Sequence, residues 1–180
     1  DLNTMVKRGL VDSAYNERRS QCEQGVDILK EYLPEIKALR DVTPEDLAKY
    51  QDKLPPVVAK RCEHIVFENE RVKDSVAALR AGNVERFGQL MRASHESLRD
   101  LYEVSCRELD IMVEAAWQAP GVCGARMTGA GFGGCTVNLV EADAVDRFVD
   151  FVKAQYAEKT GIDPEIYVCE AEDGARPLEL

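Results

Sequence analysis

Glycine is concentrated in one short segment, residues 124–134, which reads Gly-Ala-Arg-Met-Thr-Gly-Ala-Gly-Phe-Gly-Gly. Five of the chain's 12 glycines fall within these 11 positions. Glycine loses more conformational entropy on ordering than any other residue, so it is favoured where φ is positive or where another group approaches the backbone closely. Consecutive backbone amides in such a loop can form a concave site for an anion such as phosphate. The alternative is a tight hairpin that only needs flexible corners.

Gly129, Gly131 and Gly134 have the spacing G-x-G-x-x-G, which occurs in two nucleotide-binding folds. In a dinucleotide-binding fold, the glycine turn follows a strand and opens a helix. Here the turn is followed by residues 135–140, whose apolar alternation predicts a strand, so this fold is excluded. A protein-kinase glycine loop does lie between two strands, but it requires a strand lysine and the HRD and DFG motifs. The next lysine is Lys153, within a predicted helix, and neither motif occurs, so this class is excluded as well.

The first two thirds of the chain have the apolar spacing of helices, three and four residues apart. Thr43 followed by Pro44 predicts an N-cap with proline at the first helical position, and Asn83 predicts a second N-cap. Ser105 and Glu108 have the spacing of a capping box. The apolar stripes of these helices are interpreted as packing surfaces. The segments predicted to be helical are 15–33, 58–79, 84–101 and 105–116, with a further helix opening at Thr43.

The last third changes from helical spacing to alternation, which predicts strands on both sides of the glycine-rich segment. A helix over 145–156 and a strand over 165–169 follow. This order is most of a split β-α-β unit of the ferredoxin-like type, in which helices back an antiparallel sheet. One strand is missing from that order, and residues 2–6 are the candidate for it. The sequence therefore predicts an α+β fold over residues 1–180, a helix-rich segment followed by a small antiparallel sheet.

Composition excludes several classes of function. The formal net charge is -10 and the isoelectric point is about 4.8, so we expect neither nucleic-acid nor anionic-membrane binding. No apolar run approaches the roughly 18 residues of a membrane span, and no secretion signal is recognisable, so a cytoplasmic location is expected. The six cysteines contain no CxxC pair and are interpreted as buried free thiols. With only two histidines, no Cys/His metal site is expected, although a site built from carboxylates alone stays open.

Four blocks of the sequence resemble the galactokinase branch of the GHMP small-molecule kinases. Residues 124–137, which contain the glycines, resemble the third, C-terminal motif of GHMP kinases. By itself that motif implies only a GHMP kinase. The other three blocks resemble galactokinase segments in the order of that family. They are Val-Asp-Ser-Ala-Tyr-Asn-Glu-Arg-Arg-Ser-Gln-Cys-Glu (11–23), Glu-Asn-Glu-Arg (68–71) and Ser-His-Glu-Ser-Leu-Arg-Asp-Leu-Tyr-Glu-Val-Ser-Cys (94–106), the last followed by Glu-Leu-Asp (108–110).

The resemblance implies the fold of a GHMP kinase C-terminal domain and the ATP-dependent phosphorylation of galactose. The family's sugar-recognition motif, phosphate loop, and catalytic aspartate and arginine belong to its N-terminal half and do not occur in this sequence. We therefore expect a C-terminal half that is inactive alone, whose partner is the N-terminal half, with ATP and Mg²⁺ bound mainly there. A non-catalytic sugar and ATP sensor of the same family is the alternative. A helical interaction module with a glycine hairpin would leave the matched blocks unexplained.

The resemblance also implies roles for individual residues. Tyr15 matches a tyrosine that contacts the sugar, so it is predicted to bind substrate; the alternative is an aromatic side chain that only packs. Gly129, Gly131, Gly133 and Gly134 are predicted to bring the backbone up to the phosphate loop and the transfer site. No catalytic residue and no metal ligand is predicted within the chain.

Other polar residues receive structural interpretations. Arg126 is interpreted as a partner in a structural ion pair, although it could pair with phosphate. Arg18 and Arg19 are expected to pair with acidic side chains. The helical residues His64 and His95 are expected to be solvated or to cap helices, and Trp117 to lie in the core or an interface.

Ala130 departs from the family motif, which usually has a further glycine at this position. Either residue 130 has ordinary backbone angles here, or the loop has shifted and the approach of phosphate is impaired.

Overall fold

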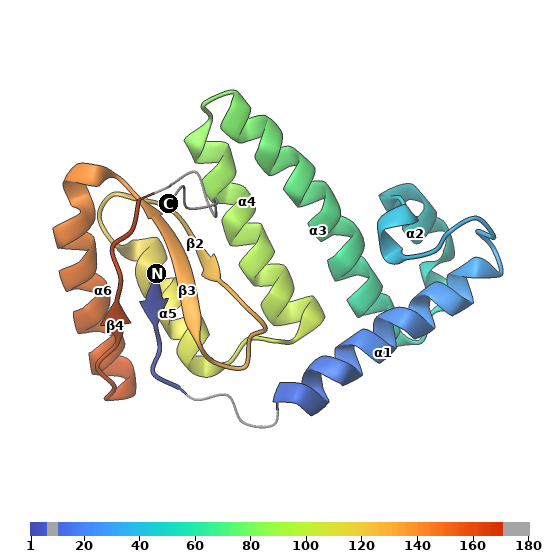
Figure 1. Cartoon of the computed structure of the whole chain (residues 1–180), viewed down its shortest axis with the longest axis horizontal. Helices are drawn as coiled ribbons and strands as arrows, with labels where there is room; N and C mark the ends of the chain where they lie inside the picture. Colours follow the sequence, from blue (N-terminus) through green and yellow to red (C-terminus); the bar gives the residue numbers. More distant parts are fainter. Residues whose placement is uncertain (7–10, 171–180) are drawn as a thin grey trace, which may run out of the picture.

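The computed structural model describes residues 1–6 and 11–170 and confirms the predicted α+β class (Figure 1). A helix-rich part occupies one side of the molecule and a small sheet the other. The helices are α1 (Val11–Lys30), α2 (Pro44–Tyr50), α3 (Pro56–Arg80), α4 (Val84–Ser97), α5 (Arg107–Gln118) and α6 (Val145–Thr160). The strands are β1 (Leu2–Asn3), β2 (Val122–Met127), β3 (Cys135–Val140) and β4 (Glu165–Ile166).

The strands form one antiparallel sheet in the order β2-β3-β1-β4. Strand β1 inserts between β3 and β4, with Leu2 opposite both Thr136 and Ile166. Strands β3 and β4 are therefore parallel, separated by β1 and connected through α6, which is the predicted split β-α-β arrangement. The N-terminal segment supplies the missing strand, as predicted. Strand β4 has only two residues, so the predicted strand over 165–169 was too long.

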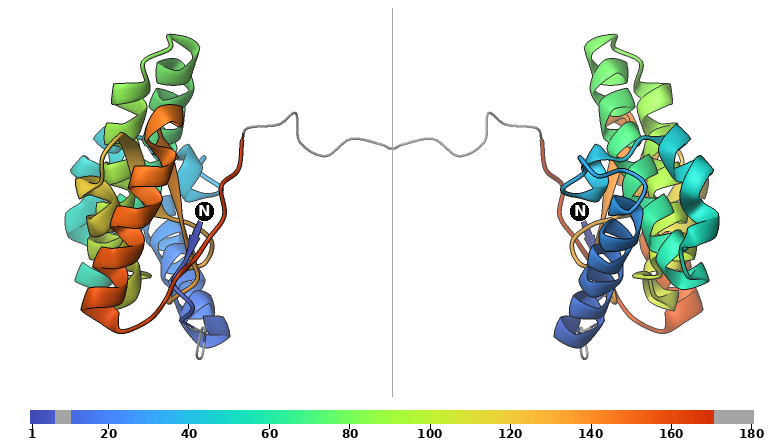
Figure 2. Two further views of the ribbon diagram at one scale, coloured as in Figure 1. Left: turned by 90° about the vertical axis from the view of Figure 1, so that its left-hand side faces the viewer. Right: turned by 90° about the vertical axis from the view of Figure 1, so that its right-hand side faces the viewer.

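Helices α5 and α6 cover one face of the sheet, as the side views show (Figure 2). Buried apolar side chains from both helices meet those of the sheet in one core cluster, which includes Leu2, Met112, Val113, Ala125, Phe148, Val152 and Tyr156. A second cluster joins α1 and α3 to the segment between them, and includes Val26, Leu29, Leu39, Leu47, Val58 and Cys62. The helical part and the sheet thus each have an apolar core.

Local capping signals in the sequence predicted two helix starts correctly. The Thr43 hydroxyl accepts the amide of Asp46 at 3.1 Å, and the Asp46 carboxylate accepts the Thr43 amide in return. Asn83 Oδ1 accepts the amide of Arg86 at 2.9 Å at the start of α4. The predicted capping box at Ser105 was wrong: Cys106 is the N-cap of α5, without a side-chain cap. The Ser105 hydroxyl instead donates to Asp110.

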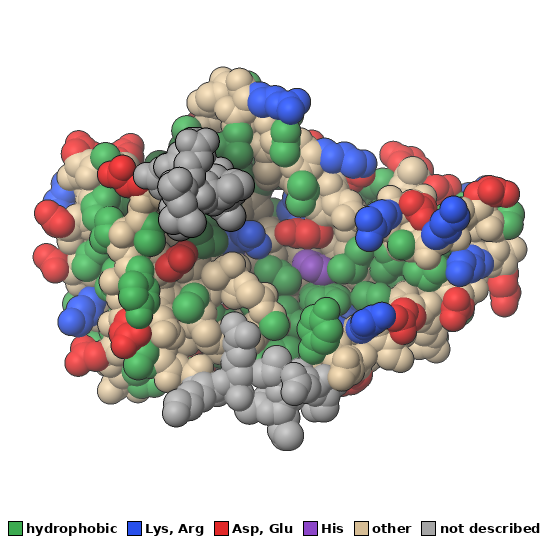
Figure 3. Space-filling view, in the orientation of Figure 1, with side chains coloured by type: hydrophobic (Ala, Val, Ile, Leu, Met, Phe, Trp, Pro, Cys, Tyr) green, Lys and Arg blue, Asp and Glu red, His purple; other side chains and the backbone are tan. Residues whose placement is uncertain are grey.

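The apolar stripe of α3 is buried only along its first half. Val58 and Val66 are buried, whereas Val72, Val76 and Leu79 are exposed. Helix α3 runs past α1 and α2 beside α4, so its last turns lack the cover that its first turns have (Figure 1). These three side chains line an apolar groove with residues of α4 and β3. Hydrophobic side chains gather across the middle of this face, while most acidic ones lie toward its two ends (Figure 3).

Helix α4 packs against the free edge of β2 without intervening side chains. Gly88 of α4 lies so close to the Cys123 carbonyl that a Cβ at position 88 would overlap the oxygen. A Cβ at Gly124 would lie only 2.7 Å from the Cα of Gly88. Since a covered edge cannot pair with another strand, α4 protects the edge of the sheet. Glycine at both positions allows the backbones to approach this closely.

We expect Gly88→Ala to destabilise the chain although alanine is the better helix former. The added methyl group must displace α4 from β2, and overpacking of this kind costs about 1–3 kcal/mol. Urea unfolding measures the difference, with Gln89→Ala as the control because Gln89 is the exposed neighbour on the same helix. The control should stay within about 0.5 kcal/mol of the parent. A gain of about 1 kcal/mol from Gly88→Ala, as at an exposed helix position, would contradict the close contact.

Candidate functional site: the glycine loop and the Tyr15 groove

Residues 129–134, here called the glycine loop, connect β2 to β3 in a backbone conformation that requires glycine. Gly129, Gly131, Gly133 and Gly134 have φ values of 79°, 85°, 127° and 88°. All four glycines singled out from the sequence therefore lie where a side chain would strain the backbone. Phe132 also has a positive φ, 58°, which is uncommon for a bulky residue.

Ala130 has no such requirement. In the described part of the chain, the residues other than glycine with positive φ are Met5, Glu103 and Phe132. Alanine at position 130 therefore has ordinary backbone angles, which is the first of the two explanations for its departure from the family motif.

Two segments that are distant in sequence hold the loop. The Phe132 amide donates to the Val104 carbonyl at 2.7 Å, and a Cβ at Gly131 would overlap that same oxygen. On the other side, the Gly134 carbonyl accepts both the amide and the hydroxyl of Thr4, at 2.9 and 2.8 Å. The loop is thus clamped between the segment after α4 and the segment after β1.

Most amides of the loop are unpaired. The Thr128 amide donates to the Cys135 carbonyl and closes the hairpin at 3.0 Å. Apart from Phe132, no amide of the loop donates to an acceptor within residues 1–6 and 11–170. Gly129 is exposed and Ala130 is half-buried, so the first amides of the loop are accessible to a ligand. Free amides on a backbone with positive φ are the arrangement that binds anions, which a hairpin turn alone does not need.

The segment from Leu98 to Val104, here called the connecting turn, lies between the loop and the helical part. It begins as a π-helical turn and ends at Glu103, which has φ 55°. The buried guanidinium of Arg61 holds it by donating to the Leu101 carbonyl and, at 2.6 Å, to the Glu103 carboxylate. Arg18 donates to the carbonyls of Tyr102 and Glu103, at 2.7 and 3.0 Å. Buried cations require such partners, because an unpaired charge in the interior is costly.

Both neighbouring arginines pair with acidic side chains, as expected, but Arg18 also has backbone partners. Arg19 pairs with Glu23 at 2.9 Å on the exposed side of α1. Arg18 lies 3.5 Å from the Glu17 carboxylate, but its closer partners are the backbone carbonyls of the connecting turn. These carbonyls lie 84 and 85 residues from Arg18 along the chain, so the interaction forms only once α1 packs beside the turn.

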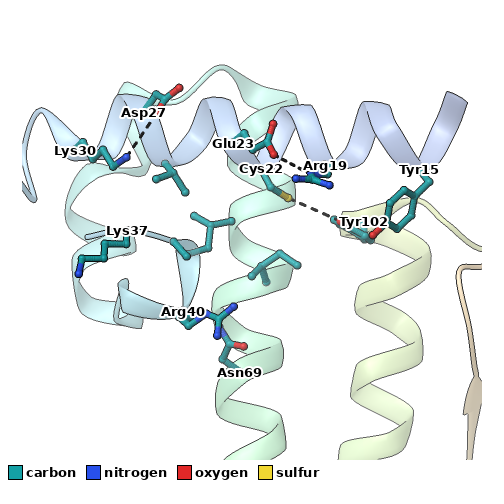
Figure 4. A pocket seen from close by; sticks show the side chains of 14 residues that line it. Tyr15, Arg19, Cys22, Glu23, Asp27, Lys30, Lys37, Arg40, Asn69 and Tyr102 are labelled. Atoms are coloured by element: carbon teal, nitrogen blue, oxygen red, sulfur yellow. Dashed lines mark hydrogen bonds and ion pairs between the residues drawn. The ribbon is translucent and has the colours of Figure 1, made fainter. Parts of the chain in front are cut away.

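Tyr15 lies at the end of an open groove of about 630 Å³ between α1, α3 and the segment before α2 (Figure 4). Its side chain is 54% exposed and lies beside Tyr102, which also lines the groove. Tyr15 is therefore not part of the core, unlike Val26 and Leu29 of the same predicted stripe. No glycine of the loop is among the 14 residues that line the groove. Tyr15 and the loop lie on two sides of the connecting turn, with Tyr102 facing the groove and Val104 holding the loop.

Charged, polar and apolar side chains together line the groove, and its one thiol is neutral. Burial raises the pKa of the Cys22 thiol and of the Tyr102 phenol, which lie 3.9 Å apart. Both groups are therefore neutral near pH 7, and a thiolate nucleophile is excluded here. Asn69 of α3 reaches the groove beside Arg40 (Figure 4). Its Nδ2 atom is buried without an acceptor in the described residues.

Both histidines are buried, so the expectation of solvated or capping roles was wrong. His64 Nδ1 lies 2.8 Å from the Ser97 hydroxyl, and its ring stacks on Tyr102. Burial lowers the pKa of His64 to about 4, so this ring is neutral at pH 7. His95 is fully buried, and its Nδ1 accepts the amide of Met127 at 3.2 Å. Helix positions alone did not indicate this, because the partners come from other elements.

Trp117 packs against the core of the sheet, as expected, and its indole N–H donates to the Ala125 carbonyl at 3.0 Å.

The expectation for Arg126 was wrong, because Arg126 forms no ion pair with a residue that the structure describes. It lines the apolar groove between α3, α4 and β3, away from the glycine loop. Sequence reasoning also missed Arg61, whose partners are 40 or more residues away in the chain, so no local spacing marks it.

The described residues contain neither a metal site nor a membrane-spanning helix. All six cysteines are free, but only Cys62 is buried, so the interpretation of buried thiols holds for one of them. Within residues 1–6 and 11–170, no group of three His, Cys, Asp or Glu side chains is placed to hold a metal ion. None of the helices in this part of the chain combines the length and the apolar character needed to cross a membrane.

Comparison with known proteins gives one consistent family. Residues 75–158 match the family model described as GHMP kinases C terminal. The chain is 49% identical over 177 residues to a galactokinase of Clostridium beijerinckii, covering 98% of this chain and 45% of that protein. It is 51% identical over 169 residues to a galactokinase of Chloroflexus aurantiacus, covering 94% of this chain and 43% of that protein. The chain thus spans just under half the length of the curated relatives it matches.

Solved structures agree with the sequence relatives. The crystal structure of Lactococcus lactis galactokinase complexed with galactose superimposes with a TM-score of 0.88 at 40% identity, covering 92% of this chain and 43% of that one. L. major mevalonate kinase in complex with R-mevalonate matches with a TM-score of 0.54 at 21% identity over 88% of this chain and 38% of that one, which supports the fold alone. The sheet, the helices that back it and the matched sequence agree: residues 75–158 form a GHMP kinase C-terminal domain, and the chain is similar to the C-terminal part of galactokinases over nearly its whole length.

Proposed function

We propose that this chain is the C-terminal half of a galactokinase, which transfers the γ-phosphoryl group of ATP to the anomeric hydroxyl of galactose. The products are galactose 1-phosphate and ADP. The observation that carries the proposal is the glycine loop, in which all four glycines of the family motif have positive φ and most amides have no acceptor among the residues that the structure describes. The relatives of this chain at 49% and 51% identity are named galactokinases, which supports the same chemistry here.

Tyr15 is the proposed contact to the sugar. Galactose is a neutral polyol, so it is recognised by hydrogen bonds, and a phenol can both donate and accept one. The side chain is more than half exposed at the end of the groove, so a ligand can reach it. That exposure supports the binding role over the alternative of an aromatic residue that only packs.

The glycine loop is the proposed support for the phosphate-binding part of the site. Catalysis of phosphoryl transfer depends mainly on positioning and on stabilising the charge of the transferred group. Amides that are already free and oriented can do this without reorganisation. In the reaction, the anomeric oxygen forms a bond to the γ-phosphorus, the bond to the bridging oxygen breaks, and the hydroxyl proton leaves. No side chain of the glycine loop can take that proton, so its acceptor is assigned to the N-terminal half.

The N-terminal half of the enzyme is the proposed partner of this chain. It would bind most of ATP and Mg²⁺, since the described residues offer no acidic cluster for the metal. The exposed apolar groove lined by Val72, Val76 and Leu79 supports this partnership, because exposed apolar patches of this kind commonly mark interfaces. Free thiols and the use of ATP fit a cytoplasmic location.

The 180-residue chain alone should not phosphorylate galactose, because its catalytic base and phosphate loop are assigned to the other half. ADP release with galactose and ATP measures this, for the isolated chain and for the full-length protein side by side. Turnover by the isolated chain at the rate of a complete kinase would contradict the proposal. Binding of galactose and ATP by the full-length protein without ADP release would identify a sensor instead.

In the full-length enzyme, Tyr15→Phe should raise the galactose KM several-fold and leave the ATP KM nearly unchanged. The expected loss is one hydrogen bond to a neutral group, worth about 0.5–1.5 kcal/mol. Tyr32→Phe is the matched control, since Tyr32 is also partly exposed but stacks on Tyr50 outside the groove. If galactose kinetics are unchanged while the melting temperature drops, Tyr15 is a packing residue.

Ala130→Gly should slightly destabilise the protein, by about 0.4–1 kcal/mol, because glycine gains entropy in the unfolded chain. Since position 130 needs no positive φ, the glycine should not raise kcat. Gly129→Ala is the opposite control: its φ of 79° disfavours a side chain, so both stability and activity should fall. Thermal unfolding and ADP release measure the two effects, and a clear gain of activity in Ala130→Gly would show that alanine impairs the loop.

A further inference from the structure

On the edge of β2 that faces away from β3, backbone groups form hydrogen bonds with side chains instead of with another strand. In an antiparallel strand, alternate residues direct their amide and carbonyl groups to the same side. Ala125 and Met127 are two such residues on the outer edge of β2. The Ala125 carbonyl accepts the indole N–H of Trp117, and the Met127 amide donates to Nδ1 of His95. These contacts come from α5 and α4, so each helix is tied to the strand that leads into the glycine loop.

The hydrogen bond from Met127 determines the tautomer of His95. A backbone amide can only donate, so Nδ1 carries the lone pair and the ring proton is on Nε2. Nε2 faces Oδ1 of Asp110 at 3.4 Å but forms no hydrogen bond with any residue that the structure describes. The same carboxylate oxygen accepts the Ser105 hydroxyl at 2.5 Å. Met127, His95, Asp110 and Ser105 therefore form one chain of polar groups, in which His95 is fully buried and Asp110 is partly exposed.

This chain of polar groups completes the attachment of the loop at its entrance. The loop is held in the middle, at Phe132, by the Val104 carbonyl, and at its exit, at Gly134, by Thr4. Its entrance follows Met127, the last residue of β2. Phe132 has a positive φ, and such a conformation costs about 1–3 kcal/mol and persists only where the surroundings enforce it. An anchor at the entrance is therefore needed to hold the whole loop in its strained form.

We propose that His95 is a positioning residue for the glycine loop, which fixes the backbone of Met127 through its Nδ1 atom, while the Asp110 carboxylate faces the Nε2 side of its ring. It acts through the loop and does not touch the reacting atoms. The effect expected on catalysis rests on the proposed function, since a loop that is displaced by about 1 Å from the phosphoryl group can slow transfer by up to about 100-fold. Removal of the anchor should lower kcat more than it changes substrate affinity.

Conservative variants separate positioning from packing. His95→Asn places an amide oxygen near the position of Nδ1 and can still accept the Met127 amide. His95→Phe keeps the ring that meets Trp117 edge to face, with centroids 5.6 Å apart, but has no acceptor. His95→Gln extends an amide toward Asp110 and withdraws it from Met127. Leu47→Val is the control for general loss of stability, because Leu47 is buried in the core of the helical part and lines neither groove.

The test measures kcat and galactose KM in the full-length enzyme, and hydrogen exchange of the amides of residues 127–134. We expect His95→Phe and His95→Gln to lower kcat about tenfold or more with KM within about twofold, and to accelerate exchange of the Met127 amide. His95→Asn should keep most of the parent's kcat and most of the protection of the Met127 amide from exchange. If the phenylalanine variant fails to fold, the comparison of Gln with Asn is sufficient.

Three results would overturn the proposal: Asn as impaired as Phe and Gln, unchanged kcat and exchange in the Phe and Gln variants, or an equal loss of kcat in Leu47→Val. Hydrogen exchange in the 180-residue chain is independent of activity. If the full-length parent releases no ADP, the proposed function fails, while faster exchange at Met127 in His95→Gln than in His95→Asn would still support the anchor.

Discussion

The direct contact between α4 and the outer edge of β2 is the constraint on which the candidate site depends. Gly88 and Gly124 allow the two backbones to touch, and any side chain at position 88 would overlap the Cys123 carbonyl. This approach brings the last turn of α4 beside the end of β2, where His95 meets the Met127 amide. The helix thus takes the place of a further strand and protects the edge. The hairpin that carries the glycine loop is held by this contact.

The connecting turn joins the two surfaces that the proposed reaction would use. Its residue Tyr102 lines the groove beside Tyr15, and the carbonyl of its last residue, Val104, accepts the Phe132 amide. The buried guanidinium of Arg61 holds the turn through the Glu103 carboxylate and a backbone carbonyl. Because removing one partner of a buried charge leaves the other unpaired, this cluster resists local opening. Sugar-side and phosphate-side elements therefore share one rigid backbone segment.

Local signals predicted the elements well. The caps at Thr43 and Asn83 and the alternation on both sides of the loop depend on neighbouring residues, so they can be recognised without knowledge of the fold. The signal at Ser105 failed because the hydroxyl has a better partner in Asp110, within a network that includes His95 from another helix. Both histidines were misinterpreted for the same reason, since burial depends on what packs over a helix and not on its own residues.

The sequence by itself determined the α+β class, the family resemblance and the special backbone of the glycine loop, because glycine spacing and periodicity are properties of short segments. It also identified the four glycines, all of which have positive φ. Only the tertiary structure decided that Arg61, Arg18 and His95 hold the surrounding segments. The backbone groups to which they bind lie 32 to 85 residues away along the chain, and hydrogen bonds over such separations form only when packing brings the elements together.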